Sequence, residues 1–302
     1  MVEVSTTASG AFLWVKLVVA SLLSGLCDGD DIEDLRRRLK ELPPDLEDLF
    51  QHMLNKLNPL YKEQASQYFQ IFCEGIKLLD RPFKTIDMCF AEAGAEACLS
   101  TQIQDFGIPG VIKKSKLLEK RLRSRCCGLL ELYWQQGRPA DSDVAGATLS
   151  TTDYPIQAEK TLLGARVQYL HRSVAEFLHR KDIWANILRE TEGSTFNVHQ
   201  RLSHACLANL NTIKSTHYLH LTSVNEAKVY AEALLHCEQL FEECGNIAQT
   251  AIVDDMVLVM QDLWTNAASW TLQYWPGLSG ISMSPSCSIS PMPWMKINTC
   301  SH

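Results

Sequence analysis

The sequence lacks the motifs by which common enzyme classes are identified. It contains no Gly-Lys dipeptide, and therefore no G-x-x-x-x-G-K-[ST] loop to hold the phosphates of a nucleotide. G-x-G-x-x-G, H-E-x-x-H and G-x-S-x-G are also missing, as are the usual signs of dinucleotide binding, zinc proteolysis and serine hydrolysis. The 11 cysteines include no C-x-x-C pair, and their odd number does not suit a disulfide framework. We therefore expect a cytoplasmic protein with reduced thiols and no enzymatic activity.

Strong positive charge and a clear membrane anchor are missing as well. The net charge of −7 argues against nucleic acid as a partner along the whole chain, although it permits a local basic patch. Residues 10–26, GAFLWVKLVVASLLSGL, form one apolar run, but Lys16 interrupts it and no basic residue precedes it. We expect a buried helix of a soluble protein here, with no membrane partner. One face of this helix is expected to be partly uncovered: Phe12, Leu13, Trp14, Leu17 and Val18.

Apolar spacing and turn residues divide the chain into four segments. Residues 1–58 are predicted to form three helices, the second capped by Asp30 or Asp31 and the third started by Pro44. Residues 59–180 show three helices, the strands GLLELYW and RVQYL, and a polar insertion at 135–160, which is the winged-helix order. Residues 181–265 are predicted to form a second helical bundle, and residues 266–302 a disordered tail. The predicted fold is mainly α, with a central winged helix and a small β-hairpin.

Two patterns imitate functional sites. TAIVDD at 250–255 resembles a magnesium-binding strand end, but the following residues continue at helical length, so we expect Asp254 and Asp255 on a helix surface. His199 and His204 are five residues apart and His217 and His220 three apart; the second pair could share a helix face, but no nearby cysteine or acid completes a tetrahedral set, so we expect no metal. Nothing local supports a Cys–His catalytic pair, which places an unrecognised enzyme last among the alternatives.

A basic helix is predicted at residues 113–125, and Glu119 is the acid that opposes it. In a DNA-binding winged helix, the third helix enters the major groove. DNA binding through this helix is therefore the alternative function, although a solvated face or contact with an acidic neighbour also explains the charge run. Its basic residues are Lys113, Lys114, Lys116, Lys120, Arg121, Arg123 and Arg125.

Five motifs follow one another between about residues 8 and 210. They are ASGAFLWVKLVVASLLSGL, DIEDLRRRLKELPPDLEDLFQHML, YKEQASQYFQIF, RSRCCGLLEL and VQYLHRSVAEFL. Together they resemble the region that follows the nucleotide-binding core in fungal NACHT-type STAND NTPases. The resemblance implies a non-catalytic regulatory and interaction module of an innate-immunity or heterokaryon-incompatibility protein. It implies protein partners, either a NACHT core in trans or a second copy of this chain.

The sequence departs from that family at its beginning. In the family an NTPase core precedes the ASGAFLW segment, whereas here only the residues MVEVSTT precede it. We therefore expect a C-terminal fragment, a truncated product or an adaptor. No cofactor is expected, and ADP or ATP would bind only if a nucleotide-binding core is supplied.

His171 lies at the joint between a predicted strand and helix in VQYLHRSVAEFL. The resemblance implies that it is the histidine that reaches the phosphates of bound ADP and holds the closed, inactive state. From the residues alone, His171 can equally complete a turn by bonding to the backbone. Without a core, we expect the turn contact.

Overall fold

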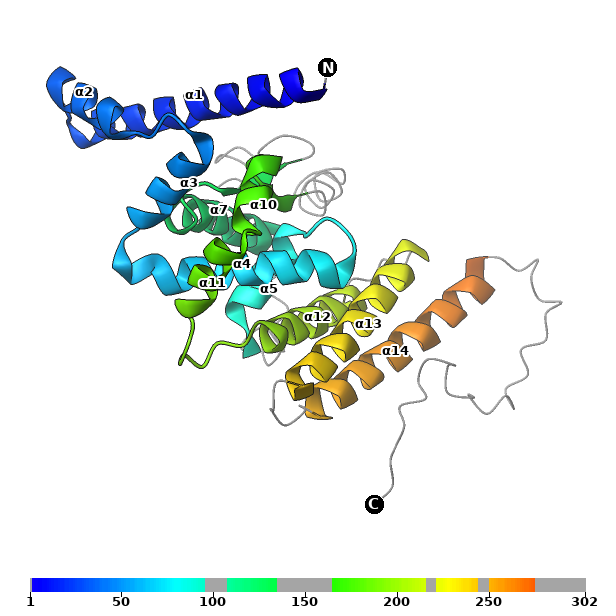
Figure 1. The fold of residues 1–302 in the computed structure, drawn as a ribbon. Coiled ribbons are helices and arrows are strands. Elements are labelled where there is room, and N and C mark those ends of the chain that lie inside the picture. The colour runs from blue at the N-terminus through cyan, green and yellow to red at the C-terminus, as the bar shows by residue number, and fades with distance from the viewer. Residues whose placement is uncertain (1, 96–107, 135–164, 216–220, 244–249, 275–302) are drawn as a thin grey trace.

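The protein is described by a computed structural model that covers residues 2–95, 108–134, 165–215, 221–243 and 250–274 (Figure 1). These residues are mainly helical with one two-stranded antiparallel sheet, which confirms the predicted mainly α fold with a small β-hairpin. The polar insertion predicted at 135–160 lies outside the described ranges. The elements are α1 (Val2–Asp28), α2 (Ile32–Glu41), α3 (Leu46–Asn55), α4 (Pro59–Leu79), α5 (Thr85–Ala93), α7 (Ile108–Arg125), β1 (Leu130–Tyr133), β2 (Arg166–Tyr169), α10 (Arg172–Leu178), α11 (Lys181–Arg189), α12 (Val198–Ser215), α13 (Leu221–Glu243) and α14 (Thr250–Tyr274).

Side-chain caps fix where α2 and α3 begin. The Asp31 carboxylate accepts two backbone N–H groups of α2, and the Asp34 carboxylate accepts the N–H of Asp31, which completes a capping box. Asp45 caps α3 by accepting two N–H groups at 2.8 and 3.2 Å. The helix therefore begins at Leu46, and the prediction that Pro44 starts it is wrong, because the aspartate satisfies the free N–H groups of the first turn.

α1 lies across one end of the molecule (Figure 1), and its segment Ala11–Asp28 is mostly exposed. Leu13 and Val18 are only 4% and 5% exposed, and the Trp14 Nε1–H donates to the Pro43 carbonyl at 2.7 Å. The predicted uncovered face is therefore wrong for Leu13 and Val18, because the chain's own α2 and α3 cover that side, whereas Phe12 is exposed and Trp14 and Leu17 are half-buried. The large apolar residues that are exposed lie on the opposite side, spaced three or four apart: Phe12, Val15, Val19, Leu23 and Leu26.

The prediction of a buried helix is also wrong for this segment. Only 17% of Ala11–Asp28 is buried, and among the described residues this stretch is long and apolar enough to cross a membrane by length and composition. The segment Ala11–Asp28 thus has one packed face and one exposed apolar face.

The central part has the element order of a winged helix. Asn58 caps α4 with Pro59 in its first turn, where the missing proline N–H costs nothing. β1 and β2 pair from Leu130↔Tyr169 to Tyr133↔Arg166. The segment between α4 and α5 also joins β2, because the Phe83 carbonyl accepts the Val167 N–H and the Thr85 N–H donates to the Ala165 carbonyl. The helices α4, α5 and α7 followed by the hairpin therefore match the predicted order.

Neighbouring helices surround α12. Residues 202–210 are all buried, and α12 packs against α4, α5, α13 and α14. The hydrophobic core runs from Leu13 to Leu263 and crosses the domain boundary predicted after residue 180. Asp254 and Asp255 are exposed on α14, as predicted. α14 continues to Tyr274, so the prediction that the tail begins at 266 is wrong, and residues 275–302 lie outside the described ranges.

Candidate functional site

His171 is the N-cap residue of α10. Its backbone is extended, its Nδ1 accepts the backbone N–H of Ser173 at 3.2 Å, and the same nitrogen lies 2.9 Å from Ser173 Oγ. Serine, threonine, aspartate and asparagine usually provide this cap. The backbone contact expected for His171 is thus present. Because Nδ1 accepts an N–H, the proton of the neutral ring belongs on Nε2, from which it can be donated to an acceptor.

A groove of about 700 Å³ lies between α1 and the body of the protein, next to this joint. Leu17 of α1, Met53 of α3 and Tyr61 of α4 line it, together with Leu170, which immediately precedes His171. The groove therefore combines apolar walls with a rim of both charges. Its charged lining residues are Lys16, Arg38, Lys56, Glu119, Arg123 and Glu131.

The predicted basic helix lies within α7, and only part of it is exposed. Lys113, Lys120 and Arg123 are exposed, whereas the remaining four are half-buried: Lys114, Lys116, Arg121 and Arg125. Arg121 pairs with the Glu92 carboxylate of α5, and the Arg125 guanidinium lies over the Tyr61 ring at 5.2 Å from its centroid. Three basic side chains of this helix therefore face solvent, whereas Arg121 and Arg125 contact neighbouring parts of the protein.

This arrangement weakens the DNA-binding alternative. Leu118 and Leu122 bury α7 in the core, and its outer side borders the groove under α1 through Arg123 and Ser124. A duplex on this side would meet three of the seven predicted basic residues beside an exposed Leu117. Phosphate contacts supply most of the affinity of such complexes, so three cations give weak, nonspecific binding.

Comparison with known proteins identifies the central part of the chain. The family model of a domain of unknown function, DUF7791, matches residues 56–221, which is more than half of the chain. The chain belongs to this family. No curated protein and no solved structure matches it. The DUF7791 region begins at the end of α3 and ends where α13 begins, so it includes the winged-helix elements, His171, α11 and α12.

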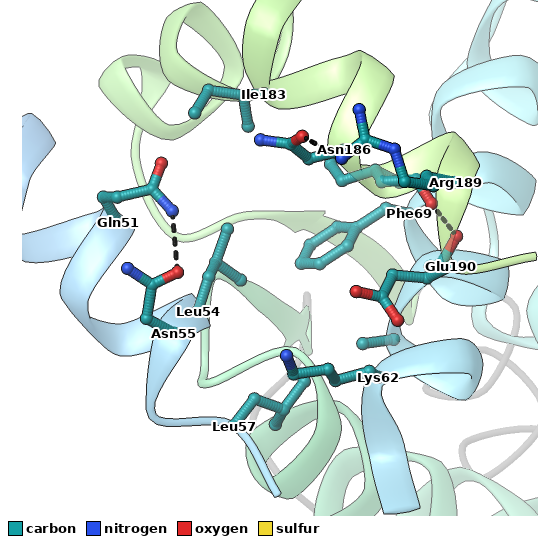
Figure 2. Close-up of a pocket in the computed structure, with 13 residues that line it drawn as sticks. Gln51, Leu54, Asn55, Leu57, Lys62, Phe69, Ile183, Asn186, Arg189 and Glu190 are labelled. Carbon is teal, nitrogen blue, oxygen red and sulfur yellow. Dashed lines mark hydrogen bonds between the residues drawn. The ribbon is translucent and has the colours of Figure 1, made fainter. Parts of the chain in front are cut away.

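A second cavity, of about 200 Å³, lies between α3, α4 and α11 (Figure 2). Phe69 and Ile183 form an apolar part of the cavity wall. Its amides are already engaged: Gln51 donates to Asn55 at 3.0 Å, and Asn186 accepts from Arg189 at 3.0 Å. The charged residues of its wall, Lys62, Arg189 and Glu190, are of mixed sign. We assign no chemistry to this cavity.

The histidines do not form a metal centre within the described ranges. No three His, Cys, Asp or Glu side chains lie close enough there to hold a metal ion. His199 is half-buried and its pKa is lowered, mainly by burial, while His204 is buried. His217 and His220 lie outside the residues that the structure describes.

The cysteines of the DUF7791 region show the opposite of nucleophilic activation. A catalytic thiol has a lowered pKa in an electropositive, accessible site. Burial instead raises the pKa of Cys73 to about 11 and that of Cys89 to about 12. Burial also raises the pKa of Cys126 and, beyond this region in α13, that of Cys237. Among the seven cysteines that the structure describes, Cys27 is the exposed one.

Alkylation tests this ordering. At pH 8 we expect iodoacetamide to modify Cys27 in the folded protein well before Cys73 or Cys89, because a thiol with a pKa of about 11 is ionised to roughly one part in a thousand. Timed labelling followed by peptide mass spectrometry measures the order, and protein unfolded in urea, where all thiols react, is the control. Rapid labelling of Cys73 or Cys89 in the native protein would restore a cysteine enzyme as a hypothesis.

Proposed function

We propose that the chain is a non-catalytic regulatory and interaction module of a NACHT-type STAND signalling protein, of the innate-immunity or heterokaryon-incompatibility type found in fungi. The observation that supports it best is His171, which caps α10 at the strand–helix joint after a hairpin in winged-helix order. This is the position from which the resemblance implies contact with the phosphates of ADP. The sequence itself has no phosphate loop, so the module acts on nucleotide only together with a core.

The surface around His171 suits a protein partner. The groove of about 700 Å³ ends at Leu170, and α1, which lines it, turns a row of exposed apolar side chains away from the chain's own core. Covering such a row stabilises a complex by about 25 cal/mol for each Å² removed from water. We propose that a nucleotide-binding core covers α1 and brings the nucleotide phosphates to His171. The proposed partner is therefore a protein that carries the phosphate loop.

A fused protein tests this function. The nucleotide-binding core of a related NACHT protein is joined upstream of the full chain, and ADP affinity is measured by calorimetry with His171 and with His171→Ala. Loss of one hydrogen bond to a charged phosphate should weaken ADP binding by about 1.5–3 kcal/mol, which is about tenfold or more. The weakened closed state should also make the variant oligomerise more readily.

Two further variants separate the phosphate contact from the cap. His171→Asn keeps an effective N-cap but is too short to reach a distant phosphate, so it should weaken ADP binding as strongly as His171→Ala. His179→Ala replaces an exposed histidine at the other end of α10 and should leave ADP affinity unchanged. In the chain without a core, His171→Ala should lower the melting temperature slightly through loss of the cap. Equal ADP affinity of the fusion with and without His171 would reject the proposed role.

A further inference from the structure

A small polar cavity of about 210 Å³ lies within the DUF7791 region, away from His171. α4, α5, α7 and α12 enclose it, with Tyr68 and Glu92 on one wall and three arginines, Arg121, Arg125 and Arg201, around it. A single buried water needs roughly 10–15 Å³ of such space, so the cavity has room for a polyatomic ligand. The arginines come from positions 121 to 201 and from two helices, so no sequence motif marks the site.

The charges around the cavity are not balanced. Glu92 provides the single carboxylate among its lining residues, against three guanidinium groups. That carboxylate is already used: it pairs with Arg121 and accepts the Tyr68 hydroxyl at 2.5 Å. Burial, and then the charge of Glu92, raise the pKa of Tyr68, so the phenol stays protonated and adds no negative charge. An excess of two positive charges remains at the wall.

The other two arginines lack an acidic partner among the described residues. Arg201 donates from Nη1 to the backbone carbonyl of Glu92 at 3.1 Å. The guanidinium of Arg125 lies over the Tyr61 ring, and its buried Nε has no hydrogen-bond acceptor. A partly buried cation without a counter-charge is costly, and an anion in the cavity would relieve that cost.

The backbone makes room for Arg201. Gly94, which ends α5, has φ +60°, in the region that favours glycine. A β-carbon on this residue would collide with the Arg201 guanidinium, so the absence of a side chain lets Arg201 lie directly against the end of α5. Gly94 thus leaves room for the Arg201 side chain beside the end of α5.

We propose that this cavity binds the phosphate group of a small phosphate monoester, or inorganic phosphate itself. The planar fork of an arginine donates two parallel hydrogen bonds to phosphate oxygens, and several arginines can share one phosphate. A phosphate monoester carries a charge of about −1.5 to −2 at pH 7, which matches the excess of two positive charges better than a carboxylate does. This site is independent of the proposed NACHT function and of His171.

The full chain is titrated by calorimetry with inorganic phosphate, O-phosphoserine and acetate, at constant ionic strength set with sodium chloride. We expect saturable binding of a phosphate compound, and no saturable binding of acetate. If phosphate binds and O-phosphoserine does not, the ligand is the free ion; if O-phosphoserine binds more tightly, it is a monoester. For O-phosphoserine, affinity should rise as pH increases through about 6, where the second proton of the monoester leaves. No saturable heat with either phosphate compound, or equal binding of acetate, would overturn the proposal.

Paired variants locate the binding. Arg125→Gln and Arg201→Gln should each weaken phosphate binding about tenfold or more, since each removes hydrogen bonds to a charged group. Arg123→Gln is the matched control, because Arg123 lies on α7 next to these residues and its side chain is 77% exposed. Arg201→Lys keeps the positive charge but loses the planar guanidinium group. Its affinity for phosphate should therefore lie between that of Arg201→Gln and that of the parent protein. Unchanged affinity in both glutamine variants would also overturn the proposal.

Discussion

Asp87→Asn should lower the free energy of unfolding by about 3–5 kcal/mol, because it removes the negative charge of a buried ion pair and leaves the positive partner without a counter-charge. Asp87 is 2% exposed and lies in the first turn of α5. Its Oδ2 accepts the Arg81 guanidinium at 3.1 Å and the Lys84 backbone N–H at 2.8 Å. Its Oδ1 accepts the Tyr230 hydroxyl at 2.6 Å and the Asn209 amide at 3.2 Å.

An asparagine side chain has one acceptor oxygen in place of the two carboxylate oxygens. The substitution therefore places an NH₂ group against hydrogen-bond donors that one of those oxygens had accepted. Asp87, Asn209 and Tyr230 belong to α5, α12 and α13, so the loss weakens the connection between the central part and the second bundle. Arg81 also lies over the Tyr230 ring at 4.9 Å, which couples these partners to one another.

Urea unfolding followed by circular dichroism measures the effect of Asp87→Asn. Tyr230→Phe should cost about 1.5–3 kcal/mol, and the double variant should cost less than the sum, because both changes remove the same hydrogen bond. Asp254→Asn, on the exposed side of α14, is the matched control. A change within about 0.5 kcal/mol for Asp87→Asn, the range of ordinary surface substitutions, would contradict a stabilising role for the network.

Phe50→Ala should cost about 3–5 kcal/mol, since it empties a fully buried aromatic position. Phe50 is 0% exposed and its ring centroid lies 5.4 Å from that of Phe177, which is 1% exposed. The pair joins α3 to α10, the helix that His171 caps. The substitution should therefore loosen the N-terminal helices from the candidate site as well as destabilise the fold.

Limited proteolysis and urea unfolding of Phe50→Ala measure these two effects. We expect faster cleavage of the segment before Pro59 together with the loss of stability. Leu60→Ala, at a side chain that is 79% exposed, should behave like the parent protein. Cleavage at the parental rate in Phe50→Ala would show that contacts other than the Phe50–Phe177 pair hold α3 in place.

Local chemistry made much of the fold predictable from sequence. The Asp31 cap and the change from helical to alternating spacing at Leu130 each depend on residues close in sequence. The start of α3 was missed because Pro44 and Asp45 both suit a helix beginning, and only hydrogen-bond geometry chooses between them.

The rest depends on contacts between distant residues. The spacing of α1 shows that it is apolar, but not which side the chain covers, so the wrong face was expected to be open. A run of positive charge does not reveal that Arg121 and Arg125 turn inward, toward Glu92 and Tyr61. The arginine cavity was missed for the same reason, since Glu92 and Arg201 meet only in the folded chain.

Because neighbouring helices surround α12, the DUF7791 region is not a unit that can be excised. The match ends at residue 221, before the two helices that cover α12 on one side. Cutting there would remove Glu238, which accepts the buried Ser203 hydroxyl at 2.5 Å, and Tyr230, which donates to Asp87. The region defined by sequence similarity is therefore shorter than the region that forms a complete hydrophobic core. A shortened protein for expression should end after Tyr274.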